Sequence, residues 1–112
     1  MTKTMQEKAI NAAELLLHRR GYEIIDTNDK FVIAESEDGE LVFAHVSITD
    51  SEDFADTPTR ELFERFAFTW LMKHSETNMH IRFDDIAMIV MGDERAFVRH
   101  NINCVSDGSC MS

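Results

Sequence analysis

The chain has 112 residues, of which 44% are hydrophobic, so it can bury one core but is too short for two domains of ordinary size. No apolar run approaches the roughly 20 residues that span a bilayer, and the first residues are amphipathic, which predicts a cytoplasmic protein with no membrane segment. The formal net charge of −10 argues against strong binding to nucleic acid, which usually needs a basic patch that displaces counterions from phosphates.

The first third of the chain is expected to form a helix and two short strands. Apolar residues from Met5 to Leu17 recur at steps of three and four, which predicts an amphipathic helix. The helix should end at Gly21, because glycine readily adopts the left-handed conformation found just past a helix C-terminus. Strands are predicted at Tyr22–Ile25 and Phe31–Ala34, separated by an Asp-Thr-Asn-Asp segment whose side chains favour a turn.

The rest of the chain is expected to add a third strand, a second helix and a strand pair. The apolar run Leu41–Ile48 predicts a central strand that is covered on both faces. A helix is predicted from residue 57 to about residue 74, because threonine can cap a helix and the proline after it fits the first turn. Two further strands, Ile81–Met91 and Ala96–Ile102, flank a Gly-Asp-Glu turn. The predicted order is α-β-β-β-α-β-β, an α/β fold with a mixed central sheet of about five strands flanked by helices.

Two side-chain patterns within these elements bear on function. The aromatic residues of the second helix follow helical spacing on one side, which favours a place in the core over a platform for stacking nucleic-acid bases: Phe63, Phe66 and Trp70. Three basic residues of the last strand form either a modest basic edge or simply a solvated strand face: Arg95, Arg99 and His100.

The C-terminus is expected to be a tail. Residues 1–104 are predicted to form the single domain, and residues 105–112, which are rich in serine, aspartate and glycine, are predicted to be flexible. The two cysteines, Cys104 and Cys110, have no spacing typical of zinc ligands, so free thiols are expected.

Short motifs occur in a recognisable order along nearly the whole chain. They are Gly21-Tyr22, Ile33-Ala34, Asp38-Gly39 with Leu41-Val42-Phe43, Trp70-Leu71, and Arg82-Phe83-Asp84 with Ile86-Ala87. In order and spacing these motifs resemble the YraN family of restriction-endonuclease-like proteins, which are related to archaeal Holliday-junction resolvases. The resemblance implies the restriction-endonuclease-like fold, and this expectation agrees with the element order deduced above.

The resemblance also indicates where a nuclease site should lie. Cleaving members of that fold hold a divalent metal with an aspartate on the second strand and a glutamate on the third, and a lysine two residues later assists the attacking water. Here Phe31 stands at the aspartate position, His45 at the glutamate position and Ser47 at the lysine position. A glutamate of the family's first helix is replaced by Ile10. The resemblance therefore implies a nuclease-like domain that has lost its metal site.

A relocated site is the alternative. Glu35, His45 and Asp50 could converge near the strand ends, with Arg82 and Asp84 completing a candidate pocket, because a histidine among carboxylates can bind a transition metal. Against this, His45 could be a partly buried strand residue and the two carboxylates part of a solvated acidic surface. For Arg82 and Asp84, a site-orienting pair and an ordinary surface pair both stay open. No cofactor is expected unless the site has moved, in which case it would use Mg²⁺ or Mn²⁺.

Three functions are compatible with these features. The leading hypothesis is a catalytically degenerate nuclease-fold domain that does not cleave and binds either nucleic acid, weakly, or a protein. The second is a metal-dependent endonuclease with a relocated active site. The third is an acidic protein-interaction module that attracts a basic partner protein, since acidic residues are concentrated in the middle of the chain. A homodimer is compatible with each of them.

Overall fold

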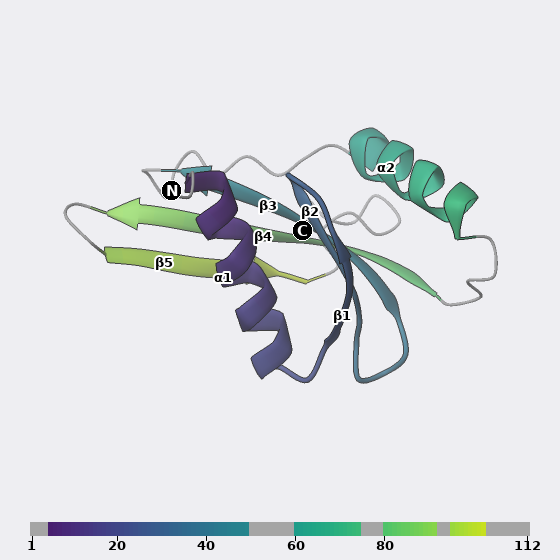
Figure 1. Ribbon diagram of the computed structural model, residues 1–112, viewed down its shortest axis with the longest axis horizontal. Helices are drawn as coiled ribbons and strands as arrows, with labels where there is room; N and C mark the ends of the chain where they lie inside the picture. The colour runs from purple at the N-terminus through teal and green to yellow at the C-terminus, as the bar shows by residue number, and fades with distance from the viewer. Residues whose placement is uncertain (1–4, 50–59, 75–79, 92–94, 103–112) are drawn as a thin grey trace.

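The computed structural model describes residues 5–49, 60–74, 80–91 and 95–102, which form two helices and five strands (Figure 1). In chain order these are α1 (Met5–Arg19), β1 (Glu23–Thr27), β2 (Phe31–Glu35), β3 (Leu41–Thr49), α2 (Arg60–Lys73), β4 (Ile81–Met91) and β5 (Arg95–Asn101). The predicted element order and the mixed five-stranded sheet flanked by helices are confirmed. The predicted start of the second helix, Asp50, both cysteines and the predicted tail lie outside the described residues.

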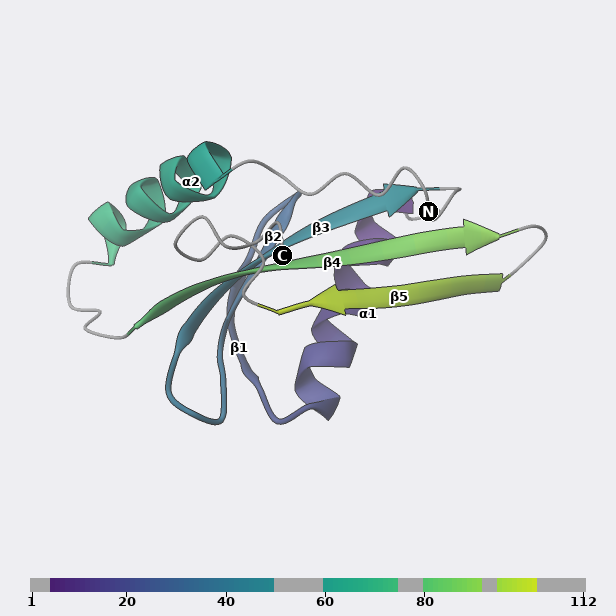
Figure 2. The same cartoon turned by 180° about the vertical axis from the view of Figure 1, so that it is seen from behind.

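The strands lie side by side in the order β1-β2-β3-β4-β5, so that β1 and β5 are the outer strands (Figures 1 and 2). All neighbours are antiparallel except β3 and β4, which are parallel. A parallel neighbour requires a crossover connection, and the segment that contains α2 supplies it. Neither described helix is long and apolar enough to cross a membrane.

The two helices cover opposite faces of the sheet. Successive side chains of a strand point to opposite sides, so each central strand contributes residues to both cores. On one face, Val32 and Val42 are buried with Leu17 of α1. On the other face, Phe43 is buried with Trp70 of α2. We call these the α1 face and the α2 face. The aromatic stripe of the second helix belongs to the core, as predicted, since Phe63 and Trp70 are buried and Phe66 packs against them.

Helix α1 ends where glycine permits it. Gly21 has a φ of 89°, the left-handed conformation expected just past a helix C-terminus. The Tyr22 amide donates to the Leu17 carbonyl at 2.9 Å, and the Gly21 amide donates to the His18 carbonyl at 3.1 Å. Together these bonds form a Schellman motif, and its C-terminal residue, Tyr22, packs in the same core cluster as Leu17.

Strand β1 is longer than predicted and is irregular. It runs through Thr27, and its register with β2 shifts between Ile24 and Asp26, so Ile25 is an extra residue in a β-bulge. The turn that follows is held by Asn28, whose side-chain oxygen accepts hydrogen bonds from the Lys30 and Phe31 amides, both at 2.8 Å. This turn places Phe31 at the start of β2.

Candidate functional site

The two motif positions Phe31 and His45 lie opposite each other on β2 and β3, on the α2 face. Phe31 is only 3% exposed, and its ring stacks on Phe66 with centroids 4.0 Å apart and planes 5° apart. It also meets the rings of His45 and Phe63 edge-on, at 5.2 and 5.8 Å. We call Phe31, Phe63, Phe66 and His45 the aromatic cluster. Packed rings therefore occupy the position at which the YraN resemblance places a metal-binding aspartate.

A buried carboxylate lies beside this cluster. The parallel register places Asp85 of β4 next to His45, and the His45 Nδ1 is 3.3 Å from the Asp85 Oδ1. Asp85 is 1% exposed, whereas the His45 side chain is 14% exposed. The second Asp85 oxygen and the Ser47 hydroxyl are buried without a hydrogen-bond partner among the described residues. A buried carboxylate with one long contact is costly for the fold.

Metal chemistry at this point would need more ligands than the described residues bring together. Within those residues there is no group of three or more histidine, cysteine, aspartate or glutamate side chains placed to hold a metal ion. The donors at this point are the carboxylate of Asp85, the imidazole of His45 and the hydroxyl of Ser47. The pair His45–Asp85 can exchange or hold a proton, since the imidazole nitrogen faces a carboxylate oxygen.

The sheet separates the residues of the sequence-predicted candidate pocket. Glu35 pairs with Leu41, at the opposite end of the β2–β3 pair from His45, so the two side chains do not converge. Arg82 pairs with Val42 and Asp84 with Ala44, which places both side chains on the α1 face, away from His45. The predicted pocket is thus divided into a β2–β3 part on the α2 face and a separate Arg82–Asp84 pair.

Arg82 and Asp84 are not an ordinary surface pair, because Asp84 is buried, Arg82 is largely buried, and both belong to a hydrogen-bonded network. Arg82 donates from Nε and Nη2 to the two Asp84 oxygens, at 2.9 and 2.8 Å, and from Nη1 to Glu40 at 3.0 Å. Its Nη2 also donates to the Tyr22 hydroxyl. Burial alone would lower the pKa of Arg82, but the hydrogen bond and charge of Asp84, with a contribution from Tyr22, raise that pKa above its ordinary value.

His100 completes this network, and sequence reasoning missed it. Its side chain has no exposed surface, and its Nε2 lies 2.6 Å from Asp84 Oδ2. The Arg20 Nη1 lies 2.8 Å from the His100 Nδ1, and arginine can only donate, so Nδ1 accepts and Nε2 donates to Asp84. The solvated strand face expected for the last strand therefore holds for Arg99, which is exposed, but not for His100. Strand alternation is the only sequence signal that separates these two neighbours.

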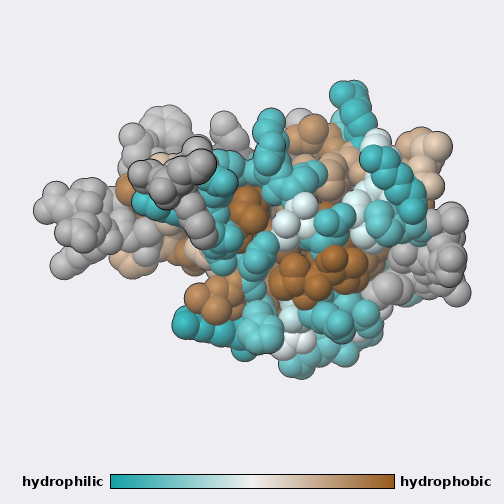
Figure 3. Space-filling view, in the orientation of Figure 1, coloured by the Kyte–Doolittle hydropathy of each residue, from teal (hydrophilic) through white to brown (hydrophobic). Residues whose placement is uncertain are grey.

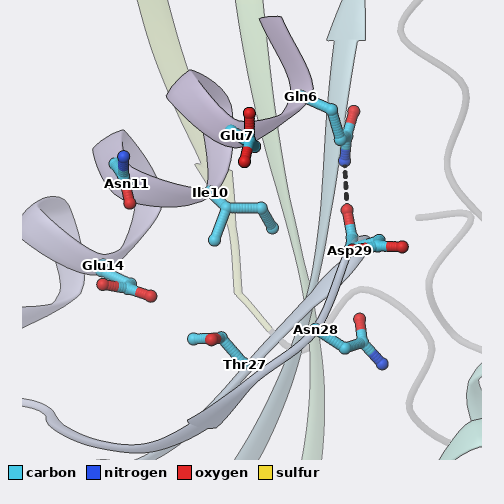
Figure 4. Close-up of a pocket in the computed structure, with 8 residues that line it drawn as sticks. All are labelled: Gln6, Glu7, Ile10, Asn11, Glu14, Thr27, Asn28 and Asp29. Atoms are coloured by element: carbon cyan, nitrogen blue, oxygen red, sulfur yellow. Dashed lines mark hydrogen bonds between the residues drawn. The ribbon is translucent and has the colours of Figure 1, made fainter. Parts of the chain in front are cut away.

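A cleft lined mainly by polar residues lies between α1 and the β1–β2 turn. It measures about 580 Å³, and Figure 4 shows side chains of α1 facing those of the turn. Its lining residues are Gln6, Glu7, Ile10, Asn11, Glu14, Thr27, Asn28 and Asp29. Three of these are acidic and none is lysine or arginine. The Gln6 amide donates to the Asp29 carbonyl at 2.6 Å and so closes one end of the cleft (Figure 4). We call it the acidic cleft.

The acidic cleft could have been found only in part from the sequence. Its α1 residues recur at helical spacing along one side, but their pairing with the turn depends on the fold. Ile10, which stands where the YraN resemblance places a glutamate, lines the cleft and is buried. The carboxylates of the cleft therefore come from other lining residues, namely Glu7, Glu14 and Asp29.

A second cleft lies on the other side of the same turn. It measures about 460 Å³ between the turn and α2, and it is lined by residues 28–31 together with Leu62, Arg65, Phe66 and Thr69. Figure 3 shows hydrophobic residues at the surface over α2, with hydrophilic residues between them. The most exposed of the described large apolar side chains on α2 are Phe68 and Met72.

Sequence comparison matches the chain to no protein-family model and to no curated protein. The resemblance to the YraN family therefore stays a prediction from the motifs.

Proposed function

We propose that this chain is a YraN-like domain of the restriction-endonuclease-like fold that has lost its catalytic site and acts as a binding module for a basic protein partner. The arrangement of the sheet supports the fold assignment. A three-stranded antiparallel meander, a crossover through α2 and a parallel β4, with helices on opposite faces, agrees with the core that the resemblance implies.

The aromatic cluster is the observation that carries the loss of cleavage. A hydrated divalent ion needs oxygen ligands and space for water. At Phe31 the chain instead offers a phenyl ring stacked on Phe66 and shielded from solvent, and the glutamate and lysine positions carry His45 and Ser47. Phosphodiester hydrolysis of the kind that depends on those three positions is not expected.

The charge of the chain favours a basic protein over nucleic acid. The formal net charge is −10, and a polyanion such as DNA would be repelled. The acidic cleft offers space lined by carboxylate and amide oxygens, which suits lysine or arginine side chains. Affinity of this kind should fall as salt screens the charges.

A cleavage assay tests the first part of the proposal. The protein is incubated with Mg²⁺ or Mn²⁺ and with branched, single-stranded and duplex DNA, and no cleavage is expected. The double variant His45→Glu with Ser47→Lys restores two of the three motif positions and serves as a comparison. Metal-dependent cleavage by the unmodified chain that is lost in His45→Ala would overturn the assignment.

A binding assay tests the partner. Fluorescence anisotropy compares a labelled lysine-rich peptide with a labelled duplex DNA at low and moderate salt. The peptide should bind, more weakly as salt rises, and the pair Glu14→Gln with Asp29→Asn should weaken it. The pair Glu37→Gln with Asp38→Asn removes the same charge from the β2–β3 turn and is the matched control. Preferential binding of DNA, or equal effects of both pairs, would contradict the proposed site.

The pair His45–Asp85 favours a second candidate, an enzyme with a relocated metal site. Its support is the buried Asp85 oxygen that accepts no hydrogen bond from the described residues. Thermal shift with Mn²⁺ and Zn²⁺ separates the two candidates, because an ion that binds only the folded state stabilises it by mass action. A stabilisation that disappears in His45→Ala and in Asp85→Asn supports the relocated site, and an unchanged melting temperature supports the binding module.

A further inference from the structure

Strand β5 is the last of the described strands at one side of the sheet, and it carries exposed apolar side chains. β5 pairs with β4 on its inner side, and no described strand pairs with its outer side (Figure 2). Phe97 is 55% exposed and Val98 is 38% exposed, although they lie in the middle of the strand. Unpaired amide and carbonyl groups beside apolar side chains are a template for another strand.

The edge is held in place from within. The buried hydrogen bond between His100 and Asp84 attaches β5 to β4, and Arg20 fixes the other side of the His100 ring. A strand that is already anchored loses little further conformational freedom when a second strand pairs with it. The outer edge of β5 is therefore preorganised.

The β5 sequence is self-complementary about Val98. In an antiparallel pair of β5 strands centred on that residue, Val98 faces Val98 of the other copy, and Phe97 faces Arg99. Aromatic and aliphatic side chains stabilise neighbouring strands when they stand opposite each other or diagonally across the pair. Arg95 would face Asn101, so no two arginines stand directly opposite each other.

The charge of β5 also singles out this edge. The strand contains two arginines and a histidine and no acidic residue, in a chain whose formal net charge is −10. Two copies of such a chain repel each other over most of their surfaces. Each positive β5 strand is attracted by the net negative charge of the other copy, and this attraction offsets the repulsion between the two like-charged β5 strands.

We infer that β5 is a dimerisation edge, whose occupant is the β5 strand of a second copy of this chain. The two sheets join into one continuous sheet about a twofold axis at Val98, a symmetric interface in which the same surface is used twice. The axis is perpendicular to the sheet, so the α1 helices of the two copies lie on the same face of the joined sheet. This inference goes beyond the proposed binding function and does not depend on it.

Sedimentation velocity on the full chain tests the dimer. The unmodified protein should sediment as a dimer in the micromolar range, with tighter association as salt screens the net charge. Phe97→Glu should give a folded monomer whose circular dichroism spectrum matches that of the unmodified protein. Phe68→Glu makes the same substitution at a phenylalanine that is 66% exposed on α2 and should leave the dimer intact. A monomer at every concentration, or a dimer broken by Phe68→Glu and not by Phe97→Glu, overturns the inference.

A disulfide trap tests the register. In a background with Cys104→Ser and Cys110→Ser, Val98→Cys places two thiols opposite each other, with α-carbons about 4.5–5.5 Å apart, a separation that a disulfide can bridge. Oxidation should yield a covalent dimer, and Phe68→Cys in the same background should not. Covalent dimer from Phe68→Cys alone would place the contact elsewhere. Binding of the basic peptide is measured separately. A chain that proves monomeric would leave the proposed binding function unaffected, and a chain that does not bind the peptide would leave the proposed dimer unaffected.

Discussion

Asp84 of β4 and His100 of β5 are joined by a hydrogen bond of 2.6 Å, and neither side chain has any exposed surface. The same carboxylate accepts two hydrogen bonds from Arg82, so a buried charge is surrounded by donors from two strands. Its neighbour Asp85, one residue further along β4, points to the opposite face, and its one hydrogen-bonding contact among the described residues is with His45, at 3.3 Å. Two adjacent buried aspartates thus differ in how many hydrogen bonds their carboxylates accept.

Asp84→Asn should strongly destabilise the fold. The substitution removes the negative charge from between Arg82 and His100 and leaves a buried guanidinium with less compensation, so a loss of about 3 kcal/mol in the free energy of unfolding is expected. Urea denaturation followed by circular dichroism measures it. Glu64→Gln breaks an exposed ion pair with Arg60 and should cost less than about 0.5 kcal/mol. A loss for Asp84→Asn as small as this control would contradict the prediction.

Asp85→Asn should have the opposite outcome. It removes a poorly paired buried charge, so the free energy of unfolding should stay the same or rise by up to about 1 kcal/mol. The measurement is the same urea titration, with Asp84→Asn as the comparison because it changes the adjacent residue in the same way. A large loss of stability for Asp85→Asn would indicate that the carboxylate has a partner other than His45.

Gly21→Ala and Gly39→Ala should each cost about 1 kcal/mol, because both glycines have left-handed φ values, 89° and 82°, that an alanine adopts with strain. They differ in their surroundings. A β-carbon at Gly21 would overlap the Glu37 side chain, whereas one at Gly39 would meet nothing within 4 Å. Glu37 is exposed and can move aside, so the two losses should be similar. Thermal denaturation of both, with Gly21→Ala repeated in Glu37→Ala, checks this. If Gly21→Ala instead costs much more than Gly39→Ala, and Glu37→Ala removes the difference, the Glu37 side chain cannot move aside.

Asp26→Ala should destabilise the packing of α2 on the sheet by about 1–2 kcal/mol. The Asp26 Oδ2 accepts a hydrogen bond of 2.9 Å from the Trp70 Nε1, and without it this largely buried indole loses its partner. Trp70 is the single tryptophan of the chain, so its fluorescence reports the change directly. Asp38→Ala, on the exposed β2–β3 turn, is the control. Equal unfolding midpoints for the two variants would mean that the bond adds little.

The features that could be predicted from the sequence are those that depend on neighbouring residues. The end of α1 at Gly21 follows from the conformational freedom of glycine, and the core position of Phe63 and Trp70 follows from helical spacing. The pairing of β1 with β2, of β2 with β3 and of β4 with β5 could be anticipated because short connections keep successive strands together, whereas β3 and β4 are joined only through α2. These inferences need only local geometry.

The site could not be predicted in the same way because it depends on register. Glu40 and Arg82 are 42 residues apart, and His100 is 16 residues from Asp84. Nothing in the sequence specifies that β3, β4 and β5 align these residues. The grouping of Glu35 with Asp84 failed for a related reason, since the two side chains occupy different faces of the sheet. The bulge at Ile25 was likewise invisible in the Glu-Ile-Ile-Asp-Thr sequence of β1.

That bulge decides which way the second half of β1 faces. Ile24 pairs with Ala34, and a regular strand would then place Asp26 opposite Val32, inside the aliphatic layer beneath α1. The extra residue reverses the alternation, so Asp26 pairs with Ile33 and reaches Trp70, while Thr27 takes the place opposite Val32. Without the bulge, a strand of the same sequence would exchange a carboxylate bonded to an indole for one buried among valine and alanine side chains, whereas deleting Ile25 itself would remove the bulge and keep Asp26 opposite Ile33.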